Sequence, residues 1–227
     1  MNQQENRTIG PYYRLTAVMC IVVAALIAAA VALYFVWPYS PGRLDTAEIL
    51  SLLAAEPFAG FMTLDLSMVV IAPFNTVVFV GLYLALREQR EAFALLALIL
   101  GAIAFATMIT SRPVIELLEL GREYAVAPPA AREALVTIGD GLLLYYEGTA
   151  WVIQTVLFLL PGLIFAILMR RSPGFGTAES VVGIVVSVAG FGFAIPDAGG
   201  VLLLINTIGT VFWYPMLARR FWRLAEL

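Results

Sequence analysis

The sequence predicts an all-α fold: a polytopic membrane bundle of six transmembrane helices, with short amphipathic helices capping the outer side. Composition is the first reason, because 62 % of the 227 residues are hydrophobic, 13 % are charged, and the mean hydropathy is +0.93. Soluble domains average about 45–50 % apolar and about 25 % charged residues, so this chain lacks the polar surface that an aqueous globule needs. The second reason is a series of long uncharged runs. Crossing a hydrocarbon core of ~30 Å takes about 20 helical residues, since lipid offers the backbone no other hydrogen-bond partner.

The six predicted spans form one transmembrane domain over residues 15–218, flanked by short segments at 1–14 and 219–227. The spans cover about 15–37, 64–86, 92–111, 148–169, 180–196 and 198–218. The first run exceeds the length of an ordinary signal-peptide core, and its end at Phe35, Trp37 and Tyr39 is typical of an aromatic interface anchor. Pro and Gly residues in 196–200 predict a tight reversal between the last two spans.

The distribution of arginine along the chain predicts the orientation of the spans in the membrane. With six spans, one side of the membrane collects most of the arginines and the other side keeps four, Arg43, Arg112, Arg122 and Arg132. The arginines of the first side are Arg7, Arg14, Arg87, Arg90, Arg170, Arg171, Arg219, Arg220 and Arg223. Because cytoplasmic loops carry the excess of positive charge, we expect both termini in the cytoplasm, and the protein in the cell (inner) membrane of a prokaryote.

The two long outer segments, 38–63 and 112–147, are predicted to form a helical cap at the outer interface. Asp45-Thr46-Ala47-Glu48 has the spacing of a capping box and opens an apolar stripe. In the second segment, apolar residues from Ile115 onward extend the preceding span past the membrane surface. After two prolines, residues 131–138 predict another turn or two of helix, leading through Gly139-Asp140-Gly141 toward the next span.

Missing residue types restrict the chemistry. The sequence has no His, all its basic residues are Arg, and Cys20 is its one cysteine. This removes haem and zinc sites built on His, His-based catalytic triads, lysine Schiff bases and internal disulfides. We therefore expect no cofactor, no bound metal and no enzymatic activity, and the net charge of −3 indicates no nucleic-acid partner.

Three carboxamides at similar depth form the first candidate site. Asn75, Gln154 and Asn206 lie about 10–15 Å from the outer ends of their spans, counted at ~1.5 Å per residue, and each of these spans also contains a proline, Pro73, Pro161 or Pro215. One interpretation is a neutral polar layer that binds a hydrophobic ligand or a small solute. The other is interhelical hydrogen bonding, worth roughly 0.6 kcal/mol per bond.

Charged residues at the outer membrane surface form the second candidate site. The members are Asp65, Arg112, Asp140, Glu147 and Asp197. Arg112 is placed to neutralise Asp65 or Glu147 and so to hold helix ends together. The alternatives are a vestibule for a cation or polar head group, rimmed by Tyr145 and Tyr146, and simple solvated helix ends.

A stripe of small residues predicts close helix packing. Ser180, Gly183, Ser187 and Gly190 recur on one face of the fifth span. Small residues let helix backbones approach closely in membranes. The contact lies either within this bundle, which we favour, or in a partner subunit.

The order of these features resembles a family of six-helix prokaryotic membrane proteins known only as a domain of unknown function. The similarity runs from about Arg14 to Phe221. It rests on the arginine-tagged first span, on 44–50 opening an outer amphipathic helix, and on Gly60 and Asp65 at the start of the second span. A Pro-initiated outer helix that runs through Asp140 into the fourth span, and the terminal Gly-rich hairpin, complete it. The resemblance implies a fold rather than an activity. Members of that family often have a His near the start of the fourth span, where this chain has Tyr145-Tyr146-Glu147.

Three functional hypotheses follow. The leading one is a non-catalytic binding or accessory component that holds a lipid-like ligand or a partner membrane protein, with membrane lipid, another membrane protein or a second copy of the chain as partners. The second is a facilitator for a small neutral solute that passes Asn75, Gln154 and Asn206. The third is an intramembrane hydrolase or transferase that uses Asp65 or Glu147 with Arg112, either alone or with a metal held by carboxylates.

Overall fold

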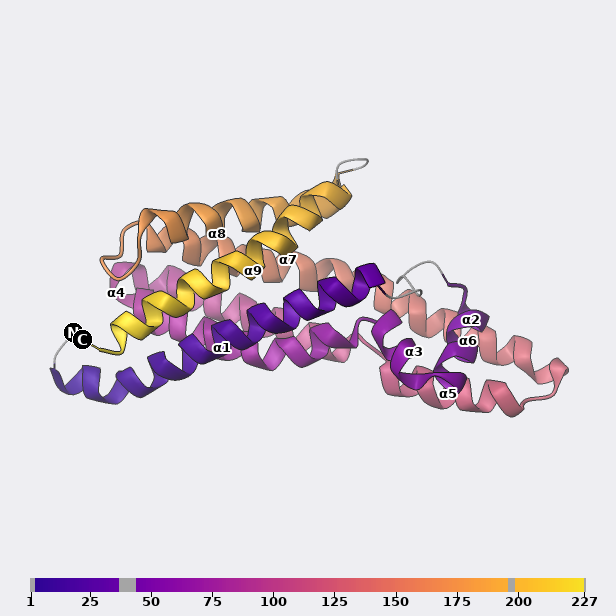
Figure 1. Cartoon of the computed structure of the whole chain (residues 1–227). Coiled ribbons are helices and arrows are strands. Elements are labelled where there is room, and N and C mark those ends of the chain that lie inside the picture. The colour runs from indigo at the N-terminus through magenta and orange to yellow at the C-terminus, as the bar shows by residue number, and fades with distance from the viewer. Residues whose placement is uncertain (1–2, 37–43, 196–198, 227) are drawn as a thin grey trace.

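The computed structural model describes residues 3–36, 44–195 and 199–226, and the regular structure in these ranges is helical (Figure 1). The long apolar runs lack the alternation that is typical of strands, and they form helices, as the sequence predicts. In chain order the helices are α1 (Gln3–Val36), α2 (Thr46–Ala55), α3 (Pro57–Thr63), α4 (Leu66–Thr110), α5 (Val114–Val126), α6 (Pro129–Glu147), α7 (Thr149–Met169), α8 (Thr177–Gly190), the short 3-10 helix η1 (Phe191–Ala194) and α9 (Gly199–Leu224).

Among the described residues, four helical stretches are long and apolar enough to cross a membrane. They are Ile9–Leu33, Leu66–Val126, Pro129–Met169 and Gly199–Leu224. Large apolar side chains lie exposed along the bundle, such as Ile99 on α4, Val185 on α8 and Phe212 on α9. Monomeric soluble proteins rarely expose a continuous apolar surface of this extent. The bundle is therefore suited to lipid, and the chain has the character of a membrane protein.

α4 is two antiparallel arms rather than one rod. A straight helix of 45 residues would be about 68 Å long. Yet Asp65, which precedes α4, and Arg112, which follows it, approach within 3.3 Å. The reversal occurs at Arg90, whose backbone angles (φ −159°, ψ 89°) are not helical. The two arms correspond to the predicted segments 64–86 and 92–111.

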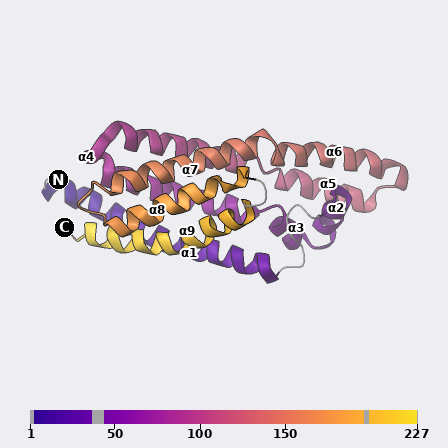
Figure 2. The same cartoon turned by 90° about the horizontal axis from the view of Figure 1, so that it is seen from above.

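The long helices pack as a closed ring of neighbours. α1 contacts α9, α9 contacts α8, α8 contacts α7, α7 contacts α4, and α4 contacts α1 (Figure 2). Aromatic rings fill the interior, where Phe79 packs edge-on against Phe105 and Phe165, with ring centroids 5.1 and 5.5 Å apart. The start of α1 and the end of α9 lie together at the end of the bundle farthest from the cap, and Tyr13 packs on Phe221 there (Figure 1).

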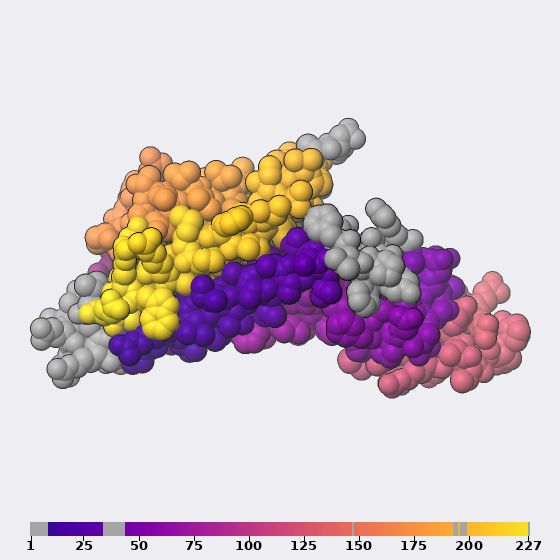
Figure 3. All heavy atoms as spheres, in the orientation of Figure 1, coloured from indigo at the N-terminus to yellow at the C-terminus, as the bar shows by residue number. Residues whose placement is uncertain are grey.

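The cap forms the other end of an elongated molecule (Figure 3). It consists of α2, α3, α5 and α6, and has its own apolar core of Ile49, Leu50, Leu53, Leu64, Val114, Leu117, Leu118 and Leu120. The capping box predicted at the start of α2 is present: Glu48 N donates to Asp45 Oδ1 (2.8 Å), and Asp45 N donates to Glu48 Oε2 (2.9 Å). The predicted helical cap is therefore a small packed unit.

The structure corrects three boundaries. α5 does not continue the preceding span, because Pro113 cannot donate a backbone hydrogen bond and a new helix begins at Val114. α6 does not end near 138 but runs for 19 residues through Gly139 and Gly141 to Glu147. α8 begins at Thr177, before the predicted 180, and gives way to η1 after Gly190. The predicted reversal at 196–200 and the aromatic anchor after Val36 lie largely outside the described residues.

Candidate functional site

Asp65 occupies a left-handed turn between the cap and the bundle. Its backbone angles (φ 58°, ψ 38°) make it the one non-glycine residue with positive φ among the described residues. Asp tolerates this conformation better than most residues. The turn lets α3 end and α4 begin within two residues, and Ser67 Oγ donates a hydrogen bond of 3.1 Å to Asp65 Oδ1.

Arg112 is the most highly connected charged group at this junction. Its Nη1 donates to Met108 O and to Gln154 Oε1, both at 2.9 Å, and its Nη2 lies 3.3 Å from Asp65 Oδ2. The Arg112 side chain is only 3 % exposed, whereas that of Asp65 is 34 % exposed. Hydrogen bonds to a charged group are about twice as strong as neutral ones. Arg112 therefore joins both ends of α4 to α7.

An aromatic ring completes the surroundings of Arg112. Its guanidinium carbon lies 5.5 Å from the ring centroid of Tyr146, within cation–π range. Its Nε is buried and has no hydrogen-bond partner among the described residues. Arg112 thus connects the bundle to α6 of the cap as well.

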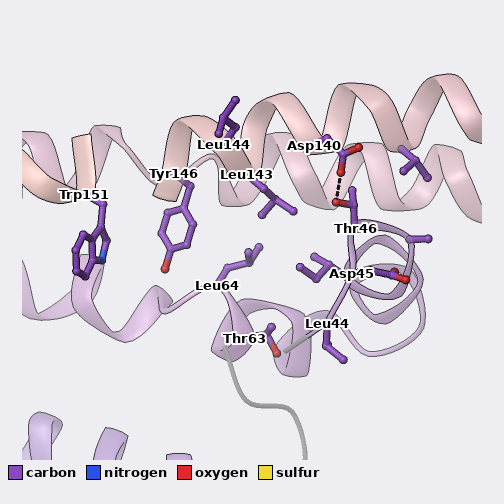
Figure 4. A pocket seen from close by; sticks show the side chains of 13 residues that line it. Leu44, Asp45, Thr46, Thr63, Leu64, Asp140, Leu143, Leu144, Tyr146 and Trp151 are labelled. Atoms are coloured by element: carbon purple, nitrogen blue, oxygen red, sulfur yellow. Dashed lines mark hydrogen bonds between the residues drawn. The ribbon is translucent and has the colours of Figure 1, made fainter. Parts of the chain in front are cut away.

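A cleft of about 950 Å³ lies between the cap and the start of α7. Its 13 lining residues include Asp140, Leu143 and Tyr146 of α6 on one side and Thr63 and Leu64 on the other (Figure 4). Asp45 and Thr46 lie at one end, and Trp151 of α7 lies at the other (Figure 4). Apolar walls with a few polar groups at this volume are typical of small-molecule sites. The cleft is therefore a candidate binding site.

Two acidic residues lie at the polar end of this cleft. Thr46 Oγ1 donates a short hydrogen bond to Asp140 Oδ1 and so joins α2 to α6. Asp45 directly precedes Thr46 in the chain, and its side chain caps the start of α2. The structure thus places Asp140 in the cleft, whereas Asp65 and Arg112 are not among the 13 residues that line it. Asp197 lies outside the described residues, and the side chain of Glu147 is not described.

The three carboxamides have separate partners. Asn75 Oδ1 accepts a short hydrogen bond from the Tyr214 hydroxyl, Gln154 Oε1 accepts from Arg112, and Asn206 Nδ2 donates to Val186 O at 2.9 Å. The structure therefore does not gather Asn75, Gln154 and Asn206 into one site within the described hydrogen bonds. Each one instead joins two elements of the bundle.

The small-residue stripe faces neighbouring helices of the same bundle. Ser180 Oγ donates to Ala166 O of α7 at 2.7 Å. A Cβ atom on Gly183 would lie 2.5 Å from Trp213 of α9, one on Gly190 would lie 2.2 Å from Leu159 of α7, and one on Gly162 of α7 would lie 2.9 Å from Ser187 Oγ. These distances leave no room for a larger side chain.

Sequence reasoning missed an ion pair at the start of α8. Arg220 Nε donates to Glu179 Oε1 at 2.7 Å, and Gly176 N donates to Glu179 Oε2 at 2.8 Å. The available signal was an acid in the first turn of a helix, the position that favours negative charge.

The site has no grouping suited to a metal: no three His, Cys, Asp or Glu residues within the described ranges are placed to hold one ion. No family model matches the chain, and no curated protein and no solved structure matches it. The resemblance to a six-helix family of unknown function therefore stays an expectation from the sequence.

Proposed function

We propose that this protein is a non-catalytic integral membrane protein that holds a lipid-like ligand in the cleft between its cap and its bundle. The observation that carries the proposal is the cleft itself, a volume of about 950 Å³ walled by apolar residues and bordered by Asp45 and Asp140. A partner membrane protein seated on the cap is the other form of this accessory role, and the experiment below distinguishes the two.

The composition of the cleft favours an amphipathic ligand. Leu64, Leu143 and Leu144 supply apolar surface, while Thr46 and Asp140 supply polar groups at one end. Burying a hydrocarbon chain gains roughly 0.8 kcal/mol per CH₂ removed from water. A molecule with a tail and a polar head would satisfy both ends of the cleft, whereas a wholly polar solute would satisfy only one.

We place the cleft at the outer surface of a prokaryotic cell membrane, with six crossings and both termini in the cytoplasm. The support is the reversal of α4 at Arg90, which makes two arms from one helix, and the excess of arginine at the end opposite the cap. α8 has 14 residues, about 21 Å of helix, so its crossing needs η1 and local thinning of the bilayer.

Photo-crosslinking tests the proposal. The probe is hexadecanol with a diazirine in its chain, incorporated into liposomes that contain the purified protein. We expect saturable labelling of the peptide that carries Leu143, and its loss with excess unlabelled hexadecanol. The substitution Leu143→Gln should weaken this labelling, because it places an amide on the apolar wall. The control Ile115→Gln changes a residue of α5 that is 65 % exposed and outside the cleft, and should leave labelling unchanged.

Two outcomes count against lipid binding. Labelling confined to lipid-facing residues such as Leu95 and Ile99 would mean that the probe never enters the cleft. Equal labelling of the Leu143→Gln and native proteins would mean that the cleft wall does not hold the chain. In either case a protein partner becomes the better account of the cap.

The transport and enzyme hypotheses receive less support. A passage for a neutral solute would use Asn75, Gln154 and Asn206 together, but these side chains bind separate partners. An enzyme would need a reactive group, whereas Arg112 and Asp65 neutralise each other. Liposome flux of a neutral solute, abolished by Asn75→Ala with Asn206→Ala, would restore the transport hypothesis.

A further inference from the structure

One helix, α6, forms a whole wall of the cleft. The lining residues on this helix are Val136, Asp140, Leu143, Leu144 and Tyr146. The facing wall comes from residues between Leu44 and Ile49 and from Thr63 and Leu64 (Figure 4). A displacement of α6 would therefore change the width of the cleft and leave the facing wall in place.

α6 is loosely packed compared with the helices that it covers. Of its residues 129–146, only Gly139 is buried. By contrast, α2 and α5 each bury several residues, and these supply the apolar core of the cap together with Leu64. The apolar side chains of α6 that pack against this core are only partly buried; they are Leu135, Val136, Leu142 and Leu143. Elements with few buried contacts open locally at low cost in free energy.

Both ends of α6 are non-helical junctions. Before the helix, Ala127 (φ −71°, ψ 141°) and Pro128 (φ −64°, ψ 153°) have extended backbone, and after it Gly148 has φ −84° and ψ −140°. Hinges consist of a few residues at the ends of elements, where changes in backbone angle are absorbed. α6 is thus a 19-residue helix attached at two points that can act as pivots.

Two polar contacts hold α6 against the rest of the protein. The Thr46 hydroxyl donates to Asp140 near the middle of the helix, and the Tyr146 ring lies 5.5 Å from the guanidinium carbon of Arg112 near its end. Arg112 Nε is nevertheless buried without a hydrogen-bond partner among the described residues. A buried donor without a partner costs free energy that water would recover. Release of Tyr146 would admit water to this guanidinium, which offsets part of the lost contact.

We propose that α6 is a movable strap, which opens the cleft by pivoting at 127–128 and at Gly148. The contacts of Thr46 with Asp140 and of Arg112 with Tyr146 hold the strap closed. The opening itself needs no ligand. The inference rests on the proposed function only for what enters: the open strap admits an amphiphile to the apolar wall, and the closed strap covers it.

The reaction of a cysteine in the facing wall measures the opening. Leu64 lines the cleft and is only 3 % exposed, so Leu64→Cys should react with a water-soluble maleimide when α6 is open. Leu117 is the reference, because it belongs to the same cap core, is fully buried and lies outside the cleft. The purified protein is labelled in lipid nanodiscs and each peptide is quantified. We expect Leu64→Cys to react about tenfold faster than Leu117→Cys, since only the first needs no unfolding of the cap.

Substitutions at the two contacts should change this rate. Tyr146→Leu removes the ring from Arg112 and should speed the labelling of Leu64→Cys about fivefold. Asp140→Ala removes the acceptor for the Thr46 hydroxyl and should have an effect of similar size. The conservative variants Tyr146→Phe and Asp140→Asn keep a ring and an acceptor, and should keep the native rate.

Tyr124→Leu is the matched control. The Tyr124 ring lies 5.2 Å from the guanidinium carbon of Arg132, so this variant removes the same kind of contact. Neither residue lines the cleft, and Arg132 is close to the pivot at 127–128, where α6 moves least. The labelling rate of Leu64→Cys should therefore stay unchanged in this variant.

The outcomes separate the strap from lipid binding. Equal rates for Leu64→Cys and Leu117→Cys would mean that the cap opens only as a whole, and the strap would be wrong. Native rates in both Tyr146→Leu and Asp140→Ala would show that these contacts do not hold α6. If the strap variants behave as expected but added hexadecanol does not slow the labelling of Leu64→Cys, the strap stands and lipid binding in the cleft is wrong.

Discussion

Arg112 shows how one residue can connect two parts of a membrane protein. Moving a charged side chain out of water costs several kcal/mol unless other groups replace the lost hydrogen bonds. Met108 O, Gln154 and Asp65 replace them here, at 2.9, 2.9 and 3.3 Å. Because these partners belong to α4, to α7 and to the turn before α4, the charge is satisfied only when all three come together.

A double-mutant cycle should measure this coupling. Gln154→Leu removes an acceptor from the buried guanidinium of Arg112, so we expect it to lower the unfolding free energy by about 1–2 kcal/mol. In an Arg112→Met background the donor is gone, and the same substitution should cost little. The expected coupling energy is about 1–2 kcal/mol, measured by unfolding the protein in mixed detergent micelles.

The exposed Arg122 supplies the control for this cycle. Arg122 lies on α5, its side chain is 59 % exposed, and it pairs with Glu119. A cycle between Gln154→Leu and Arg122→Met should give no coupling. A coupling below about 0.5 kcal/mol between Gln154 and Arg112 themselves would show that their contact does not stabilise the fold.

At the scale of helices, local signals predicted more than long-range ones. The capping box of Asp45 and Glu48 depends on residues three apart, so spacing alone was enough to place the start of α2. The contact of Arg112 with Asp65 could be predicted, because both residues lie at the ends of apolar runs that were expected to reach the same membrane surface. Its hydrogen bond with Gln154 was not, because the rotation of α7 about its axis depends on the packing of the whole bundle.

Gly139 explains why the helix boundary in the cap was predicted wrongly. Two glycines in three residues usually mark a turn, yet α6 continues through both. A Cβ atom on Gly139 would lie 2.6 Å from Thr46 of α2, whereas one on Gly141 would meet nothing within 4 Å. Gly139 is thus needed for the close approach of α2 and α6, a tertiary reason that sequence periodicity does not contain.

The packing of α8 gives a sharper test with glycines. Gly183→Ala places a Cβ 2.5 Å from Trp213 and 2.8 Å from Ala166, so α8 must move away from α9 and α7. We expect a loss of about 1–3 kcal/mol in unfolding free energy, the usual cost of overpacking. Gly141→Ala is the matched control: its Cβ meets open space, and alanine in a helix interior should stabilise by about 0.5–1 kcal/mol. Thermal unfolding of both variants in the same detergent gives the comparison, and equal melting temperatures would contradict the packing.

For the molecule as a whole, the topology determines which groups can meet. The ends of α4 approach each other at the cap, so α4 has an even number of crossings or none. Its exposed apolar side chains, such as Ile99 and Ile103, make immersion in lipid the favourable state of its second arm. If α4 crosses the membrane twice, Glu91 lies on the same side as the start of α1 and the end of α9.

Cysteine labelling should establish this topology. The native Cys20 is fully buried in α1, so the chain is close to a cysteine-free background. Glu91 and Arg171 are exposed near the turns at the end of the bundle opposite the cap, and Glu116 and Glu133 are exposed on the cap. In intact cells, a membrane-impermeant maleimide should label Glu116→Cys and Glu133→Cys, because the proposed topology places the cap outside the cell. Glu91→Cys and Arg171→Cys should react only after the membrane is permeabilised. If Glu91→Cys and Glu116→Cys react from the same side, the six-crossing arrangement is wrong, and with it the placement of the cleft at the outer surface.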